Sequence, residues 1–93
     1  MNEIEKVKRK LWTFGYSVKD VSASTALGFD LIVDGRHKVK VANKDTDLEA
    51  VPREIIVAQI MGDAIVYHKA FRGQQWTETS PLKAFPKVEE KED

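Results

Sequence analysis

The apolar residues nearest the start of the chain recur at helical spacing. Each lies three or four positions from the next, which puts them on one stripe of a helix over residues 3–14: Ile4, Val7, Leu11 and Phe14. Asn2 is a suitable N-cap and Gly15 a natural stop. The pattern predicts an amphipathic first helix with its basic residues largely on the solvent side.

A β-hairpin is predicted to follow this helix. Two apolar runs, 29–33 and 39–41, flank the dipeptide Asp34-Gly35, and such a dipeptide is the strongest short-range hairpin signal. Residues 16–21 precede the hairpin as a further short strand. Three antiparallel strands are therefore expected after the helix.

The hairpin places a carboxylate among apolar residues. With 34–36 as a three-residue loop, Asp30 lies directly opposite Lys40 and on the same face as Ile32 and Lys38. A charge inside an apolar run is costly unless a partner compensates it, so Asp30 is the first candidate for a functional residue. The other face of the hairpin is expected to carry Phe29, Leu31, Val33, Val39 and Val41.

The second half of the chain is expected to add a helix and two strands. Pro52 suits the first position of a helix and Gly62 lies just past its end, so residues 52–61 are predicted to be helical. This segment is apolar on more than one side, which indicates burial. Strands are predicted over 64–71 and 76–79.

The resulting architecture is α/β. A single domain over residues 1–86 is predicted to hold a small mixed β-sheet, in which an antiparallel hairpin meander is joined by a crossover strand, with helices flanking the sheet. Ser80 and Pro81 begin a short terminal helix or turn that reaches Phe85. Residues 87–93 are charged and lack apolar anchors, so they are expected to form a disordered tail.

Composition narrows the class of protein. The chain has 93 residues with 15 basic and 15 acidic side chains, and a net charge of zero does not by itself indicate a charge-driven nucleic-acid binder. The absence of cysteine excludes disulfides and thiolate metal sites. No apolar run approaches the roughly 18 residues that a membrane span needs, and no signal peptide is visible. A soluble cytoplasmic protein without a membrane partner is expected.

Basic residues are nevertheless concentrated near the start of the chain and on the hairpin. The candidates for contact with nucleic-acid phosphates are Lys6, Lys8, Arg9, Lys10 and Lys38. The alternative for the first four is that they form the solvated face of the predicted helix. The alternative for Lys38 is a solvated strand position.

The order of these elements resembles the restriction-endonuclease-like superfamily, whose active-site pattern is written PD-(D/E)xK. The resemblance rests on the segments Gly15-Tyr16-Ser17-Val18, Gly28-Phe29-Asp30-Leu31-Ile32-Val33 and Val39-Lys40-Val41. It covers roughly residues 3–85, and the small archaeal Holliday-junction resolvases are the most similar in layout. It implies an endonuclease-like core and DNA as a partner.

The resemblance also implies a metal site, which this chain matches only in part. Such nucleases hold Mg²⁺ or Mn²⁺ with an Asp on one strand and the acid of an acid-x-Lys on the next, often with a Glu on the first helix. Asp30 matches the first acid, and Lys40 is the candidate catalytic lysine. Either alignment of the second motif, Lys38-Val39-Lys40 or Lys40-Val41-Ala42, puts a lysine where the second carboxylate belongs.

The degenerate motif suggests that an ion pair has replaced the metal. An ammonium group beside Asp30 would supply the positive charge that a metal ion otherwise supplies, so an Asp30–Lys40 pair is predicted, and no cofactor is expected. A structural, paired carboxylate is the simpler alternative for Asp30.

Three functions remain open at this stage. The first, which we favour, is a non-catalytic nucleic-acid-associated or regulatory binding domain on a nuclease scaffold. The second is a metal-dependent, resolvase-like DNA endonuclease with an atypical site. That site would use Asp30, Glu3 or Glu5, Asp34 and Lys40 with Mg²⁺ or Mn²⁺. The third is a module that binds a protein partner or forms a homodimer.

Overall fold

The computed structural model describes residues 2–86 of the chain. In that range it has two α-helices and six strands: α1 (Glu3–Thr13), β1 (Val18–Asp20), β2 (Leu31–Val33), β3 (His37–Ala42), β4 (Ile56–Met61), β5 (Ala64–Ala70), β6 (Trp76–Thr79) and α2 (Pro81–Ala84). Short 3₁₀ turns are η1 (Thr25–Leu27), η2 (Leu48–Ala50) and η3 (Phe71–Gly73). None of the described helices is long and apolar enough to cross a membrane.

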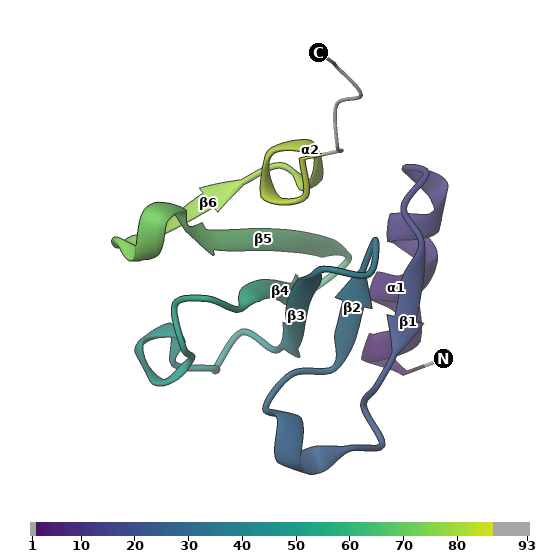
Figure 1. Ribbon diagram of the computed structural model, residues 1–93, viewed down its shortest axis with the longest axis horizontal. Coiled ribbons are helices and arrows are strands. Elements are labelled where there is room, and N and C mark those ends of the chain that lie inside the picture. The colour runs from purple at the N-terminus through teal and green to yellow at the C-terminus, as the bar shows by residue number, and fades with distance from the viewer. Residues whose placement is uncertain (1, 87–93) are drawn as a thin grey trace.

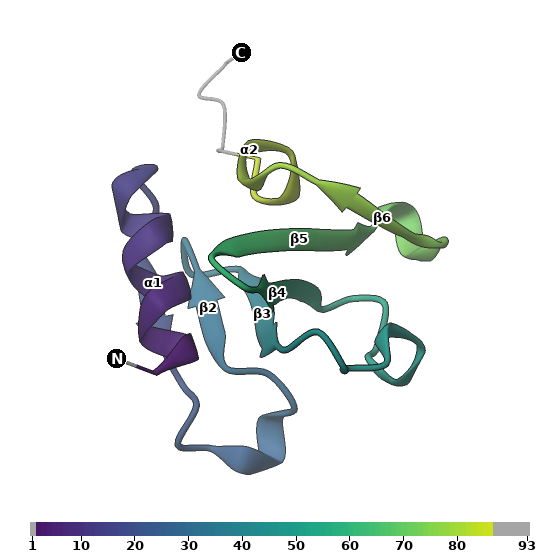
Figure 2. The same ribbon diagram turned by 180° about the vertical axis from the view of Figure 1, so that it is seen from behind.

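The strands form one open mixed sheet in the order in which they occur along the chain, from β1 to β6. Only β3 and β4 are parallel, and every other neighbouring pair is antiparallel. The sheet is twisted, so that β5 and β6 cross the direction of β1 and β2 in both views (Figures 1 and 2). The predicted α/β class with a small mixed sheet is confirmed.

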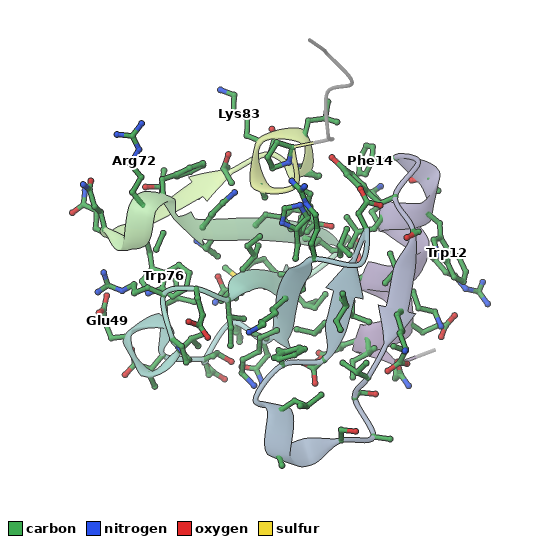
Figure 3. The ribbon with its side chains drawn as sticks, viewed as in Figure 1. Trp12, Phe14, Glu49, Arg72, Trp76 and Lys83 are labelled. Atoms are coloured by element: carbon green, nitrogen blue, oxygen red, sulfur yellow. The ribbon has the colours of Figure 1, made fainter. Side chains whose placement is uncertain are left out.

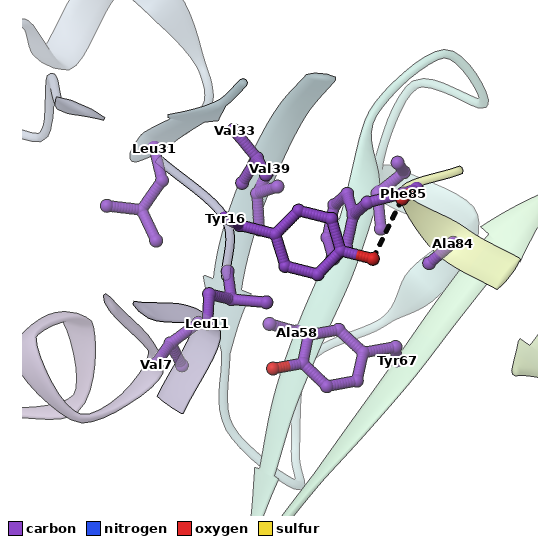
Figure 4. Packing of buried hydrophobic residues seen from close by; sticks show 11 residues of the cluster. Val7, Leu11, Tyr16, Leu31, Val33, Val39, Ala58, Tyr67, Ala84 and Phe85 are labelled. Atoms are coloured by element: carbon purple, nitrogen blue, oxygen red, sulfur yellow. Dashed lines mark hydrogen bonds between the residues drawn. The ribbon is translucent and has the colours of Figure 1, made fainter. Parts of the chain in front are cut away.

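Both helices pack on one face of this sheet. The larger core cluster is made of buried side chains from α1, the sheet and α2: Val7, Leu11, Tyr16, Leu31, Val33, Val39, Ile56, Ala58, Tyr67, Ala84 and Phe85. The opposite face has a smaller cluster, which is covered by the connection between β3 and β4: Ala42, Val51, Ile55 and Val57, with Phe29, Leu48 and Trp76 against them. The close-up in Figure 4 shows the larger cluster.

The first helix forms as its sequence predicts. The Asn2 side chain accepts a hydrogen bond from the backbone N–H of Glu5 at 2.7 Å, which caps α1. Val7 and Leu11 are fully buried, so the predicted apolar stripe does face the core. Phe14 departs from this prediction, because its side chain is 43% exposed at the end of the helix.

The predicted hairpin is present, with a β-bulge at its start. Asp34 and Gly35 have φ values of 54° and 72°, the pair of positive angles that a type I′ turn needs. Val33 pairs with His37, which confirms the three-residue loop over 34–36. Two consecutive residues of the first strand, Asp30 and Leu31, lie opposite the single residue Val39. Leu31 is the Cα partner of Val39, and the Asp30 N–H donates to the Val39 carbonyl at 2.8 Å.

The bulge corrects the predicted faces of the hairpin. Leu31, Val33 and Val39 are fully buried in the larger cluster, as expected. Phe29 instead packs against the smaller cluster on the opposite face. A bulge adds one residue to the strand and therefore reverses the side-chain alternation before it.

The predicted helix over 52–61 is wrong, because Ile56–Met61 is the strand β4. This strand lies between β3 and β5, and both of its faces are covered: Ile56 and Ala58 belong to the larger cluster and Val57 to the smaller one. A strand buried on both faces is apolar along its whole length. The crossover strand of the sheet is thus β4, which runs parallel to β3, rather than the 64–71 segment.

Gln59, the polar residue inside this strand, is satisfied by its neighbours. Its amide nitrogen donates to the Asn43 carbonyl at 3.0 Å, and its amide oxygen lies 2.8 Å from His68 Nε2. The three residues link β5, β4 and the loop after β3. These two hydrogen bonds offset the cost of removing the Gln59 amide from water.

The end of the described chain is also as predicted. The strands over 64–71 and 76–79 correspond to β5 and β6, and the short terminal helix is α2. Phe85, directly after α2, is fully buried in the larger cluster. The predicted tail, 87–93, lies outside the described residues.

Candidate functional site

Asp30, the residue that the sequence singles out, has a backbone partner. Its Oδ2 accepts a hydrogen bond from the N–H of Val41 at 2.9 Å. The predicted Asp30–Lys40 pair is not among the ion pairs of residues 2–86. The bulge explains the difference, since it aims the Asp30 carboxylate at the backbone of β3 instead of at the side chain opposite.

Lys40 lies on the face of the sheet that carries the smaller cluster, because it pairs with Val57 across β3 and β4. The acids that could have completed a metal site are elsewhere. Glu5 pairs with Lys8 and Arg9 on α1, and Asp34 accepts from the Ser17 N–H at the hairpin turn. Within residues 2–86, no group of three or more His, Asp or Glu side chains could hold a metal ion.

The basic residues of α1 are divided between two environments. Lys6, Arg9 and Lys10 line a cavity of about 520 Å³ between α1, the start of β5 and α2. Lys8 instead pairs with Glu5 at 3.7 Å and lies over the Trp12 ring at 5.2 Å from its centre. The structure therefore brings together three of the four basic residues that the helix contributes.

Lys38 lies in a different and more basic site. A groove of about 620 Å³ is bounded by the hairpin tip, the start of β4, the end of β5 and the turn η3. Its lining contains five cationic side chains, Arg36, Lys38, Arg53, Lys69 and Arg72, together with His37 and one carboxylate, that of Glu54. We call this site the basic groove.

Two of the five cations in the basic groove have acidic partners. Arg53 donates to Glu49 at 2.8 Å, and Lys38 lies 3.8 Å from Glu54. The other three, Arg36, Lys69 and Arg72, form no ion pair within residues 2–86. The groove thus has an excess of positive charge although the whole chain is neutral.

Burial and, after it, neighbouring positive charges lower the pKa of two groups in the groove. Burial, and after it the charges of Arg36 and Lys69, lowers the pKa of His37, and the opposing effect of Asp34 is weaker. Burial followed by the charge of Arg36 also lowers the pKa of Lys69. Cations that depress one another's protonation in this way are stabilised when an anion binds between them.

The rim of the groove presents a cation and an aromatic ring together. Arg72 has a left-handed backbone, with φ 58° and ψ 27°, and its side chain extends outward from η3 (Figure 3). Phe71, the residue before it, is 38% exposed, and the Lys69 ammonium lies 5.2 Å from the centre of its ring. Non-glycine residues with positive φ are uncommon and often mark functional positions.

Sequence reasoning identified only Lys38 among the cations of this groove. The others come from separate segments that meet only when β3 pairs in parallel with β4 and β5 folds back on β4. The prediction of a helix over 52–61 concealed that pairing. The one local signal was Arg36, which follows the predicted turn directly beside the segment containing Lys38.

Comparison with protein-family models, with curated proteins and with solved structures found no match to this chain. The resemblance to the endonuclease-like superfamily stays a prediction from the sequence.

Proposed function

We propose that this chain is a non-catalytic nucleic-acid-binding domain and that the basic groove binds the phosphate backbone. The observation that carries the proposal is the excess of cations in the groove, where Arg36, Lys69 and Arg72 form no ion pair within residues 2–86. Phosphate contacts supply most of the non-specific affinity for nucleic acid. Arginine is well suited to such contacts because its planar guanidinium can bind phosphate through two hydrogen bonds.

A phosphate in the groove would also relieve the mutual repulsion of its cations. The pKa values of Lys69 and His37 are lowered partly by neighbouring positive charges, and a bound anion opposes that effect. Binding of nucleic acid should accordingly raise the pKa of His37. An NMR titration of the His37 ring with and without DNA measures this change directly.

The proposal is tested first by fluorescence anisotropy with labelled single-stranded, duplex and branched DNA. Replacing both Lys69 and Arg72 by Ala should weaken binding at least tenfold at moderate salt. Lys19→Ala and Lys44→Ala are matched controls, because both residues are exposed lysines outside the groove, and they should leave the affinity unchanged. The affinity should fall with salt, with a log–log slope of about −2 to −4 for three to four phosphate contacts.

Two outcomes of this experiment would contradict the proposal. One is an absence of binding to all three DNA forms at low salt. The other is binding that depends on Lys10 of α1 and not on Lys69 or Arg72, which would move the site to the helix. Cleavage of any substrate in the presence of Mn²⁺ would reject the non-catalytic part of the proposal.

A further inference from the structure

A second cavity, separate from the basic groove, has the features of a small-molecule site. It is a partly open hollow of about 520 Å³ that shares no lining residue with the groove. We call it the helix cavity, and its lining comes from α1, the segment 63–67 and α2: Lys6, Arg9, Lys10, Thr13, Phe14, Asp63, Ala64, Ile65, Tyr67 and Pro81. Volumes of this size are typical of pockets that bind small organic ligands.

The walls and the rim of the helix cavity differ in chemistry. The walls include the apolar side chains of Phe14, Ile65 and Pro81, and Phe14 lies at the end of α1 that faces α2 (Figure 3). Lys6 and Lys10 are one helical turn apart and therefore lie on the same side of α1. An apolar interior beside two ammonium groups suits a ligand with an apolar body and an anionic head.

The other charges at the rim leave these two lysines available. Arg9 is paired with Glu5 at 3.3 Å. Neither Lys6 nor Lys10 forms an ion pair among the described residues, and Lys6 donates a 3.3 Å hydrogen bond to the Gly62 carbonyl. Asp63 is the one carboxylate in the lining and limits the net attraction for an anion.

Tyr67 supplies an independent indication of a ligand. Its side chain is only 3% exposed, it lines the cavity, and its hydroxyl has no hydrogen-bond partner within residues 2–86. Burial raises the pKa of Tyr67 to about 12, so the group is a hydrogen-bond donor at neutral pH. Figure 4 shows the hydroxyl turned away from Ala84 and toward the side of Leu11 on α1, the helix that also carries the two lysines.

We propose that the helix cavity binds a small amphipathic carboxylate, with its alkyl chain against Phe14, Ile65 and Pro81. The head group would lie between the ammonium groups of Lys6 and Lys10. The Tyr67 hydroxyl, which solvent does not reach in this structure, would donate a hydrogen bond to the head group once the side chains that cover the hydroxyl move aside. This site is distinct from the basic groove, so the proposal does not depend on nucleic-acid binding. Buried donors without a partner are rare in proteins, and a carboxylate oxygen would satisfy this one.

The experiment is a ¹H–¹⁵N NMR titration of the full chain with hexanoate, octanoate and decanoate below their micelle concentrations. Saturable shifts are expected at the amides of Phe14, Ala64 and Ile65. Each additional methylene that enters the cavity should tighten the Kd by up to about fourfold. 1-Octanol, which lacks the charge, should bind at least fivefold more weakly than octanoate.

Two variants separate a ligand site from a structural one. Tyr67→Phe should fold at least as stably as the wild type yet weaken octanoate binding severalfold, whereas a purely structural tyrosine would leave the Kd unchanged. Lys10→Ala should weaken octanoate but not octanol, and Lys19→Ala on β1 is the matched control that should change neither.

Three results would overturn the proposal. The first is an absence of saturable shifts with all three carboxylates. The second is binding whose strength is independent of chain length, which would indicate surface charge alone. The third is a dimer in sedimentation velocity that forms through the same residues and is unaffected by octanoate. That result would show that the exposed Phe14 and its neighbours contact a second copy of the chain and not a ligand.

Discussion

The hydroxyl of Tyr16 donates a hydrogen bond to the backbone carbonyl of Phe85 at 2.8 Å and joins positions that are 69 residues apart (Figure 4). The two rings also meet edge to face, with their centres 5.6 Å apart. The same hydroxyl lies 3.2 Å from the Pro81 carbonyl. Tyr16 thereby holds α2 against the segment that leads from α1 into β1, and the helix cavity lies between these two helices.

Tyr16→Phe should therefore destabilise the protein, whereas Tyr67→Phe should not. Both hydroxyls are buried, but that of Tyr16 is hydrogen-bonded and that of Tyr67 has no partner within residues 2–86. Removing a satisfied buried hydroxyl costs about 1 kcal/mol, and removing an unsatisfied one costs nothing or stabilises. Urea unfolding followed by circular dichroism compares the two variants, and equal losses would contradict the assignment of partners.

Asp30 should behave as a structural carboxylate. Asp30→Ala leaves the Val41 N–H without its acceptor and should lower the free energy of unfolding by about 1 to 3 kcal/mol. Asp30→Asn keeps an acceptor at that position and should recover most of the loss. Wild-type protein should show the same melting temperature with and without Mn²⁺, and a rise of several degrees with Mn²⁺ would revive the metal site that the sequence resemblance implies.

The fold could be predicted wherever a local pattern decides the structure. Helix α1 and the hairpin follow from periodicity, capping and turn chemistry, which act over a few residues. Strand β4 could not be recognised, because a continuous apolar run fits a buried helix or a buried strand equally well. Its β-branched residues Ile56, Val57 and Ile60 favoured a strand, but Pro52 and Gly62 suggested helix ends.

The candidate site was less accessible to sequence reasoning than the fold. Asp30 was identified as important, but its partner depends on a bulge that the sequence does not signal. The basic groove forms only through the parallel pairing of β3 with β4, which brings β3, β4 and the end of β5 into one lining that includes Lys38, Lys69 and Arg72. Such non-local pairings follow from packing across the whole sheet and leave no periodic pattern in any one segment.

Arg72 should show a trade-off between stability and binding. A left-handed backbone costs a non-glycine residue roughly 1 to 2 kcal/mol, and glycine adopts it without that strain. After glycine's larger entropy loss is included, Arg72→Gly should stabilise the fold by about 0.5 to 1 kcal/mol. The same variant should bind single-stranded DNA severalfold more weakly. Arg72→Lys, which keeps the charge but not the planar guanidinium, should keep the wild-type stability and lose less affinity than Arg72→Gly. If Arg72→Gly is more stable but binds DNA as tightly as the wild type, Arg72 does not contact the nucleic acid.

Phe71 should distinguish single-stranded from duplex nucleic acid. Its ring is exposed beside the cations of the groove, where an unpaired base can stack on it but a base inside a duplex cannot. Loss of one base stack costs about 1 to 3 kcal/mol, so Phe71→Ala should weaken single-strand binding at least fivefold. Duplex affinity, measured by the same anisotropy assay, should change little. Leu82→Ala is a control for loss of an exposed apolar side chain outside the groove.

Mild acid should destabilise the fold through its two histidines. Burial is the main cause that lowers the pKa of both His37 and His68, so the unfolded chain binds more protons than the folded one as the pH falls below the usual histidine value of about 6.5. The stability contributed by these neutral rings is complete above that pH and is lost progressively below it. At His37 the charges of Arg36 and Lys69 act in the same direction as burial and Asp34 opposes them, while at His68 only Glu78 opposes burial.

Variants show which ring is responsible for this loss. Urea unfolding between pH 7.5 and 5 should give a lower free energy of unfolding at the acidic end for the wild type. His37→Gln and His68→Gln should each flatten that dependence, and the double variant should nearly abolish it. His68 also faces the Gln59 amide oxygen at 2.8 Å, an acceptor that requires a proton on Nε2 in either charge state. The hydrogen bond therefore survives protonation of the ring. The loss of stability at acidic pH must then come from placing a charge on the partly buried His68 ring. A free energy of unfolding of the wild type that does not change between pH 7.5 and 5 would contradict that cause.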